Sequence, residues 1–189
     1  DDASFAFNTS YSNQDGFIQG SCLRRLNLSF GGDIKLSNTF TLSATADYAN
    51  TDSNRPTTNL FTLLTWIPRN LDIQNLPYQD PNTGASVYYR TTITNPIWQL
   101  NNTGFNADSV RFIGSVNLRY DITEKTNLAY TYGLDQYNEV NTNFINQGGT
   151  NSPLGLIQSF NNYNRVQNHR LIYAFNSIKF SEDFSINGQ

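Results

Sequence analysis

The stretch VRFIGSVNLRYDITEKTNLAYTYGLDQ, residues Val110–Gln136, decides the fold. From Val110 to Tyr120, apolar side chains predominate at every second position, and the positions between them are mostly polar and include two arginines. After a turn, the alternation resumes from Leu128 to Leu134. Successive side chains of a strand point to opposite faces, so this period of two predicts two β-strands, each with one apolar and one polar face.

Composition excludes several classes of protein. The chain has 189 residues, of which 38% are hydrophobic and 14% aromatic, so it should fold. A net charge of -3 leaves no basic field for a nucleic acid. The single cysteine, Cys22, and the single histidine, His169, predict no internal disulfide, no metal site and no catalytic triad. We expect no cofactor and no enzymatic activity.

The same alternation recurs along the chain and predicts an all-β fold. Strands are expected at about 3–12, 24–37, 39–49, 109–121, 127–138, 166–180 and 184–189. A change of parity between Phe175 and Ile178 indicates a bulge in the sixth strand. Short turns alternate with long polar connections, the longest being 50–108, so antiparallel neighbours would have all short turns at one end. Outer-membrane barrels have this asymmetry.

Two settings suit such strands: a half-buried soluble sheet or a membrane barrel. The expected strands run for about 11 to 15 residues, longer than soluble strands usually are. Aromatic side chains lie towards the strand ends, and the second face is polar throughout. These features favour antiparallel transmembrane β-barrel strands in the bacterial outer membrane, with lipid against the apolar face. The polar side chains expected to face the lumen are Arg111, Asn117, Arg119 and Asp135.

Six full strands and part of a seventh are fewer than the roughly eight of the smallest outer-membrane barrels. Since a transmembrane sheet cannot leave open edges in lipid, we expect this chain to be a sector of a larger barrel. The apolar run LFTLLTWI is too short for a membrane-spanning helix.

The run YSNQDGFIQGSCLRRLNLSFGGDIKLSNTFTLSATADY, residues 11–48, resembles a barrel segment of SusC/RagA-like TonB-dependent receptors of the Bacteroidota. The matching residues are Tyr11, Asn13, Gln14, Asp15, Gly16, Gly20, Ser21, Arg25 and Asn27. The sequence departs from the family pattern at Ser29 and Gly31. The segment WIPRNLDIQNLPYQDPNTGASVYYR, residues 66–90, followed by TNPIW, is similar to a long loop of that family.

The resemblance implies a plugged barrel of about 22 strands that imports oligosaccharides or peptides. Its implied partners are TonB, which would act through parts of the parent chain absent here, and a SusD-like surface lipoprotein. The alternative function is that of a small structural or adhesive outer-membrane barrel, or of a soluble antiparallel β-domain. The strand count and detergent dependence would separate these alternatives.

The long connection 50–108 contains the candidate residues for contact with a ligand or partner. Leu60, Leu63, Leu64 and Ile67 have helical spacing, which predicts a short amphipathic helix between Pro56 and Pro68. The candidate contacts to a ligand or partner are Trp66, Arg69, Tyr88, Tyr89 and Trp98. Local packing is the alternative for the helix and both tryptophans. The run from Asp80 to Gly84 is typical of a turn rather than of a calcium site.

Overall fold

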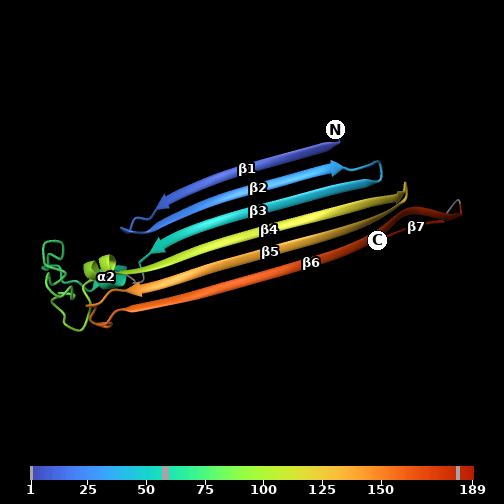
Figure 1. Ribbon diagram of the computed structural model, residues 1–189. Helices are drawn as coiled ribbons and strands as arrows, with labels where there is room; N and C mark the ends of the chain where they lie inside the picture. The colour runs from blue at the N-terminus through green and yellow to red at the C-terminus, as the bar shows by residue number, and fades with distance from the viewer. Residues whose placement is uncertain (1, 57–59, 182–183) are drawn as a thin grey trace.

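Seven antiparallel strands form one sheet in the order β1 to β7 in a computed structural model, which describes residues 2–56, 60–181 and 184–189. The strands are β1 Ala3–Asp15, β2 Cys22–Lys35, β3 Phe40–Arg55, β4 Thr103–Thr123, β5 Thr126–Ile145, β6 Leu156–Ser181 and β7 Phe184–Gly188. Two helices, α1 Leu60–Thr65 and α2 Pro96–Asn102, lie in the connection between β3 and β4. Each strand pairs with the next in the chain, and Figure 1 shows the resulting single layer.

The all-β class predicted from the sequence is confirmed, but several predicted strand ends are wrong. β4 and β5 run for 21 and 20 residues, and β6 for 26 residues. The long connection, predicted at 50–108, comprises only the residues between Arg55 and Thr103. β1 and β2 also extend past the predicted strand ends at 12 and 24, since Asp15 pairs with Cys22.

The segments added to β3 and β4, residues 50–55 and 103–108, are mostly polar, and for this reason the apolar alternation did not reveal them. Asn50 pairs with Val110 and Arg55 with Phe105, so β3 and β4 stay in register to their ends. The hydrogen bonds between paired strands join backbone groups, so two strands can stay paired where neither face is apolar. These segments therefore extend the paired sheet beyond its alternating apolar face.

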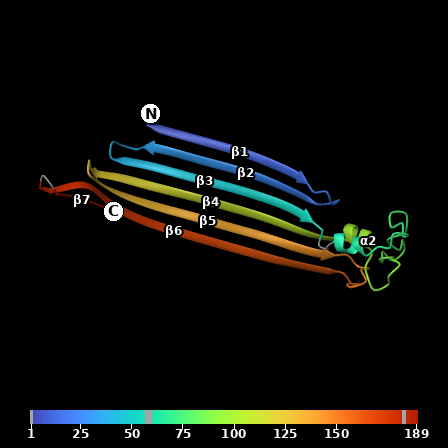
Figure 2. The same cartoon turned by 180° about the vertical axis from the view of Figure 1, so that it is seen from behind.

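The described short turns, between β2 and β3 and between β4 and β5, lie at one end of the sheet and the longer connections at the other, as predicted (Figures 1 and 2). In the turn between β2 and β3, Ser37 Oγ accepts hydrogen bonds from the backbone N–H groups of Thr39 at 3.2 Å and Phe40 at 3.1 Å. The predicted turn at 181–183 lies mostly outside the described residues. The bulge predicted in the sixth strand is present, because the register between β6 and β7 shifts between Phe175 and Ile178.

The predicted helix is present as α1, and residues 57–59 before it lie outside the described residues. α2 was not predicted, although its start has a recognisable signature. Asn95 caps the helix, its Oδ1 accepting from Ile97 N–H at 2.8 Å, and Pro96 occupies the first turn. Proline suits this position because its missing N–H would have no helical partner there.

Both faces of the sheet are open, and no second layer made of described residues covers either one (Figure 2). Among those residues, the buried side chains belong to the long connection: Leu60, Thr94, Asn95, Pro96 and Trp98. A soluble sandwich would bury its apolar strand face against a second sheet. Here that face stays exposed. No described helix is long and apolar enough to cross a membrane.

Candidate functional site: the polar strand face and the long-loop cluster

One face of the sheet is apolar and exposed. Residues paired in register share a face, so Phe40, Tyr120 and Leu128 lie side by side, and the Phe40 and Tyr120 rings stack with centroids 4.4 Å apart. Eight of the large side chains on this face are each at least 37% exposed: Phe5, Phe7, Phe30, Phe112, Val116, Leu118, Leu171 and Tyr173. An apolar surface of this extent on a soluble monomer would be unusual.

The apolar face has an oblique boundary. The apolar side chains on this face begin at Val110 on β4, at Leu134 on β5 and at Leu171 on β6. Val110 pairs with the polar Asn138 of β5, and Leu134 pairs with the polar Gln167 of β6. Thus the boundary moves towards the short turns from strand to strand. Barrel strands tilt by roughly 35–45° in a membrane, so a horizontal lipid band crosses them obliquely in this way.

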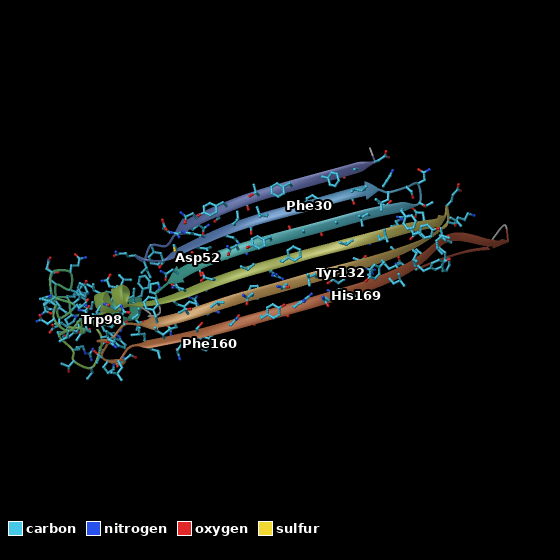
Figure 3. The ribbon with its side chains drawn as sticks, in the orientation of Figure 1. Phe30, Asp52, Trp98, Tyr132, Phe160 and His169 are labelled. Carbon is cyan, nitrogen blue, oxygen red and sulfur yellow. The ribbon has the colours of Figure 1, made fainter. Side chains whose placement is uncertain are left out.

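His169 lies at this boundary, on the same face as Tyr130 and Tyr132. Its Nδ1 is 2.7 Å from the Tyr130 hydroxyl, and its ring centroid is 5.1 Å from that of Tyr132 (Figure 3). Gln167 Nε2 donates to the Tyr132 hydroxyl at 3.1 Å. Tyrosines whose rings meet an apolar surface and whose hydroxyls meet polar groups are typical of a membrane interface.

The opposite face is polar and carries all four predicted lumen residues. Arg111 donates from Nε and Nη2 to the two carboxylate oxygens of Asp135, at 3.1 and 2.8 Å. Asn117 donates to Thr131 Oγ1 at 2.7 Å, and Arg119 donates to Asp121 at 2.9 Å. Both side chains of the Arg111–Asp135 pair remain partly exposed, at 51% and 36%. The Arg111–Asp135 and Asn117–Thr131 pairs therefore join β4 to β5, whereas Arg119 and Asp121 pair within β4.

Arg111 and Asp135 also line a shallow polar cavity of about 330 Å³ on this face. Tyr137, Asn164 and Val166 complete its lining. Tyr137 lies in the strand expected at 127–138 but was not singled out as a lumen candidate, and Asn164 lies just before the strand expected at 166–180. The cavity combines a charged pair with neutral hydrogen-bonding groups, so it suits polar solutes and water.

At the other end of the sheet, Trp98 joins the two long connections. Its side chain has no exposed surface, and its Nε1 donates to the carbonyl oxygen of Gly84 at 2.9 Å. Gly149 packs on the ring so closely that a Cβ there would lie 3.2 Å from it. Trp98 is therefore inaccessible to a ligand in this structure and packs inside the loops (Figure 3).

Backbone contacts reinforce this docking of the β3–β4 connection against the β5–β6 connection. The Ser86 N–H donates to Gly148 O at 2.8 Å, and the Thr150 N–H donates to Thr94 Oγ1 at 3.0 Å. Thr94 is only 3% exposed. The loops thus form a small folded cluster of their own.

The other predicted contact residues are exposed or half-buried on this cluster. Trp66 is 55% exposed, and its carbonyl oxygen accepts from the Tyr89 hydroxyl at 3.1 Å. The Tyr88 and Tyr89 rings meet edge to face at 4.6 Å. Arg69 is exposed. Trp66, Tyr88 and Tyr89 are therefore brought together, while a contact of any of them with a ligand or partner stays a prediction.

Beside the tyrosine pair lies an apolar cavity of about 280 Å³. Its lining includes Leu71, Ile73, Leu76, Pro77 and Val87. Asn95 also reaches the cavity, and its side chain is held by a bond from Nδ2 to Val87 O at 2.9 Å. Tyr88 and Tyr89 were predicted contact residues, but the aliphatic residues are dispersed over a loop, and no sequence pattern indicates that they enclose a space with the tyrosines.

The turn at Asp80 gives the cluster a pH dependence. Asp80 Oδ1 accepts hydrogen bonds from the N–H groups of Asn82 at 2.8 Å and Thr83 at 3.1 Å. These bonds lower the pKa of Asp80 below its ordinary value, and the bond from Asn82 has the largest effect. A carboxyl with a lowered folded pKa stabilises the turn above the unfolded value of about 3.9, and this contribution is lost as the pH falls through the folded pKa.

We expect the Asn82 and Thr83 amide resonances to shift together below about pH 4 as this carboxylate is protonated. The Asp80→Asn variant keeps an acceptor oxygen without the titration, so its turn should show no such shift. Amide shifts that stay constant to about pH 2 in the parent protein would contradict this assignment.

Comparison with known proteins gives no family assignment. No protein-family model matches the chain, and no curated protein matches it. Among solved structures it is similar to the CymD monoaromatic hydrocarbon channel, with 16% identity over 99% of this chain and 49% of that one, at a TM-score of 0.33. The P. putida toluene transporter TodX matches with 14% identity over 96% of this chain and 49% of that one, at a TM-score of 0.29.

The chain spans about half the length of these two structures. The resemblance to SusC/RagA-like receptors is contradicted, because no family model matches and these solved neighbours are named as hydrocarbon transport proteins instead. The expected count of 22 strands came from that resemblance and falls with it. TonB and a SusD-like lipoprotein were expected as partners on the basis of that resemblance alone, and this basis no longer holds.

Proposed function

We propose that this chain forms part of the wall of a β-barrel in the bacterial outer membrane, through which solutes pass. The observation that carries the proposal is the division of the long strands into an exposed apolar face and a hydrogen-bonded polar face. Lipid would cover the first and water the second. The short turns would then face the periplasm, and the docked loops would face the outside.

Open sheet edges support a wall that continues beyond these strands. β1 pairs only with β2, and β6 pairs with β7 only between Phe175 and Ser181, so its described residues before Phe175 have one unpaired edge. Unpaired backbone groups are too costly to leave in lipid. Further strands must therefore close the barrel. Transport, rather than catalysis, is the activity that such a wall suits.

Ion selectivity of the full-length protein in a planar bilayer tests this proposal. Asp135→Asn removes the carboxylate that neutralises Arg111, so the polar face gains a net positive charge. We expect selectivity to shift towards anions by roughly twofold or more, because charges lining a pore set its local potential. Glu124→Gln is the matched control, since it removes one negative charge in the turn outside the wall.

Two results would contradict the proposal. One is a reconstituted full-length protein that conducts no ions and takes up no small solute. The other is an equal selectivity change in the Asp135→Asn and Glu124→Gln variants, which would mean that Asp135 does not line the passage.

A further inference from the structure

The cavity beside Tyr88 and Tyr89 has the properties of a binding site for a small apolar ring. Its volume of about 280 Å³ approaches the lower end of ligand pockets, which is roughly 300 Å³. Aliphatic side chains and tyrosine rings line it, and no charged side chain does so among the described residues. Water inside it would find few hydrogen-bonding partners, so an apolar molecule can displace that water at little cost.

The walls of the cavity are held in place before any ligand enters. Asn95 is 2% exposed and makes three bonds: its N–H donates to Ser86 Oγ at 2.8 Å, its Nδ2 donates to Val87 O, and its Oδ1 accepts from Ile97. The Val87 N–H donates to Tyr78 O at 2.9 Å. The hydroxyl of Tyr89 is bonded to Trp66 O. A preorganised site loses less entropy when it binds a ligand.

The tyrosine pair narrows the ligand class. The two rings meet edge to face, an arrangement that leaves ring surface free to stack or tilt against a third ring. Burial, followed by the neighbouring Tyr89, raises the pKa of Tyr88, so its hydroxyl stays protonated at neutral pH. A protonated Tyr88 hydroxyl carries no charge, so the lining of the cavity remains uncharged at neutral pH.

We propose that this loop cavity binds a small uncharged monocyclic aromatic molecule. The inference rests on the proposed function only for the location of the site, at the outer mouth of a barrel. There it would concentrate such molecules from the medium beside the passage.

Equilibrium dialysis of the full-length protein in detergent tests the proposal, with phenol as the probe and empty micelles as the blank. We expect a Kd of about 10 µM to 1 mM, which suits a ligand of this size. Benzoate has the same ring and a negative charge, and it should not compete because the lining offers no cation.

Ile73→Trp fills the cavity and should weaken phenol binding at least tenfold. Leu154→Trp, which adds the same indole at a position that is 85% exposed and outside the cavity, should leave it within twofold. Leu76→Ala enlarges the cavity and should shift the preference towards 2-naphthol, which a misfolded loop would not do.

Three outcomes would overturn the proposal: no retention of phenol above the micelle blank, equal binding by the Ile73→Trp variant and the parent, or binding of benzoate as tight as that of phenol. Failure of the barrel proposal would be seen separately, as a loss of conductance with phenol binding intact.

Discussion

Replacing Val116 by arginine is expected to destabilise the membrane-inserted protein by about 2–4 kcal/mol, which is roughly a 30- to 900-fold change in the unfolding equilibrium. Val116 is 44% exposed in the middle of the apolar face, between Ala44 on β3 and Tyr132 on β5. If lipid covers this face, a guanidinium there loses its hydration without gaining a partner. Denaturant unfolding of the full-length protein from lipid vesicles measures the effect.

The neighbouring residue is the matched control. Ser115 lies on the polar face, where its hydroxyl is 2.8 Å from the Thr45 hydroxyl. Ser115→Arg loses that one exposed hydrogen bond and keeps its charge in water, so we expect a cost of about 1 kcal/mol or less. Equal costs for the two substitutions, or a larger cost at Ser115, would mean that the apolar face does not meet lipid.

Trp98→Ala is expected to undock the two long connections from each other. The indole is fully buried and donates to Gly84 O, and replacement of a buried tryptophan by alanine costs about 3–5 kcal/mol. The loss should remain local because the strand ladder does not involve this side chain. Hydrogen exchange reports it through the amides of Ser86 and Thr150, which bond across the two connections. They should exchange roughly 100-fold faster or more.

Trp66→Ala serves as the comparison for this prediction. The Trp66 side chain is 55% exposed, and the carbonyl that accepts from Tyr89 survives the substitution. We expect the same two amides to exchange within about fivefold of the parent rate. Unchanged protection in the Trp98→Ala variant would show that the loops are held together by other contacts.

Alternating polarity was sufficient to predict the strands and the end of the sheet at which the short turns lie, because successive side chains of a strand point to opposite faces. It could not predict the strand ends. Asn50 and Arg55 belong to β3, and Thr103 begins β4, yet nothing in their polarity distinguishes them from a loop. What fixes them is the register with their partners, a property of two segments that lie far apart in the sequence.

The candidate site divides in the same way. Arg111, Asn117, Arg119 and Asp135 could be placed on one face because parity alone decides this in a strand. The burial of Trp98 could not be predicted, since a tryptophan in a loop can be exposed or buried. The docking of the 146–155 segment against its ring decides between the two. The apolar cavity depends likewise on how a 47-residue interval between Arg55 and Thr103 folds back on itself.

The most direct test of the two-faced wall is spin labelling of single cysteines at positions 112–119 of β4, in the full-length protein reconstituted in lipid, with Cys22 replaced by serine. Collision rates with oxygen, which dissolves in lipid, should be high at the even positions, and those with a water-soluble nickel complex should be high at the odd positions. A period of two with opposite phases for the two reagents is the predicted result. Equal nickel access at even and odd positions would contradict a wall with lipid on one side and water on the other.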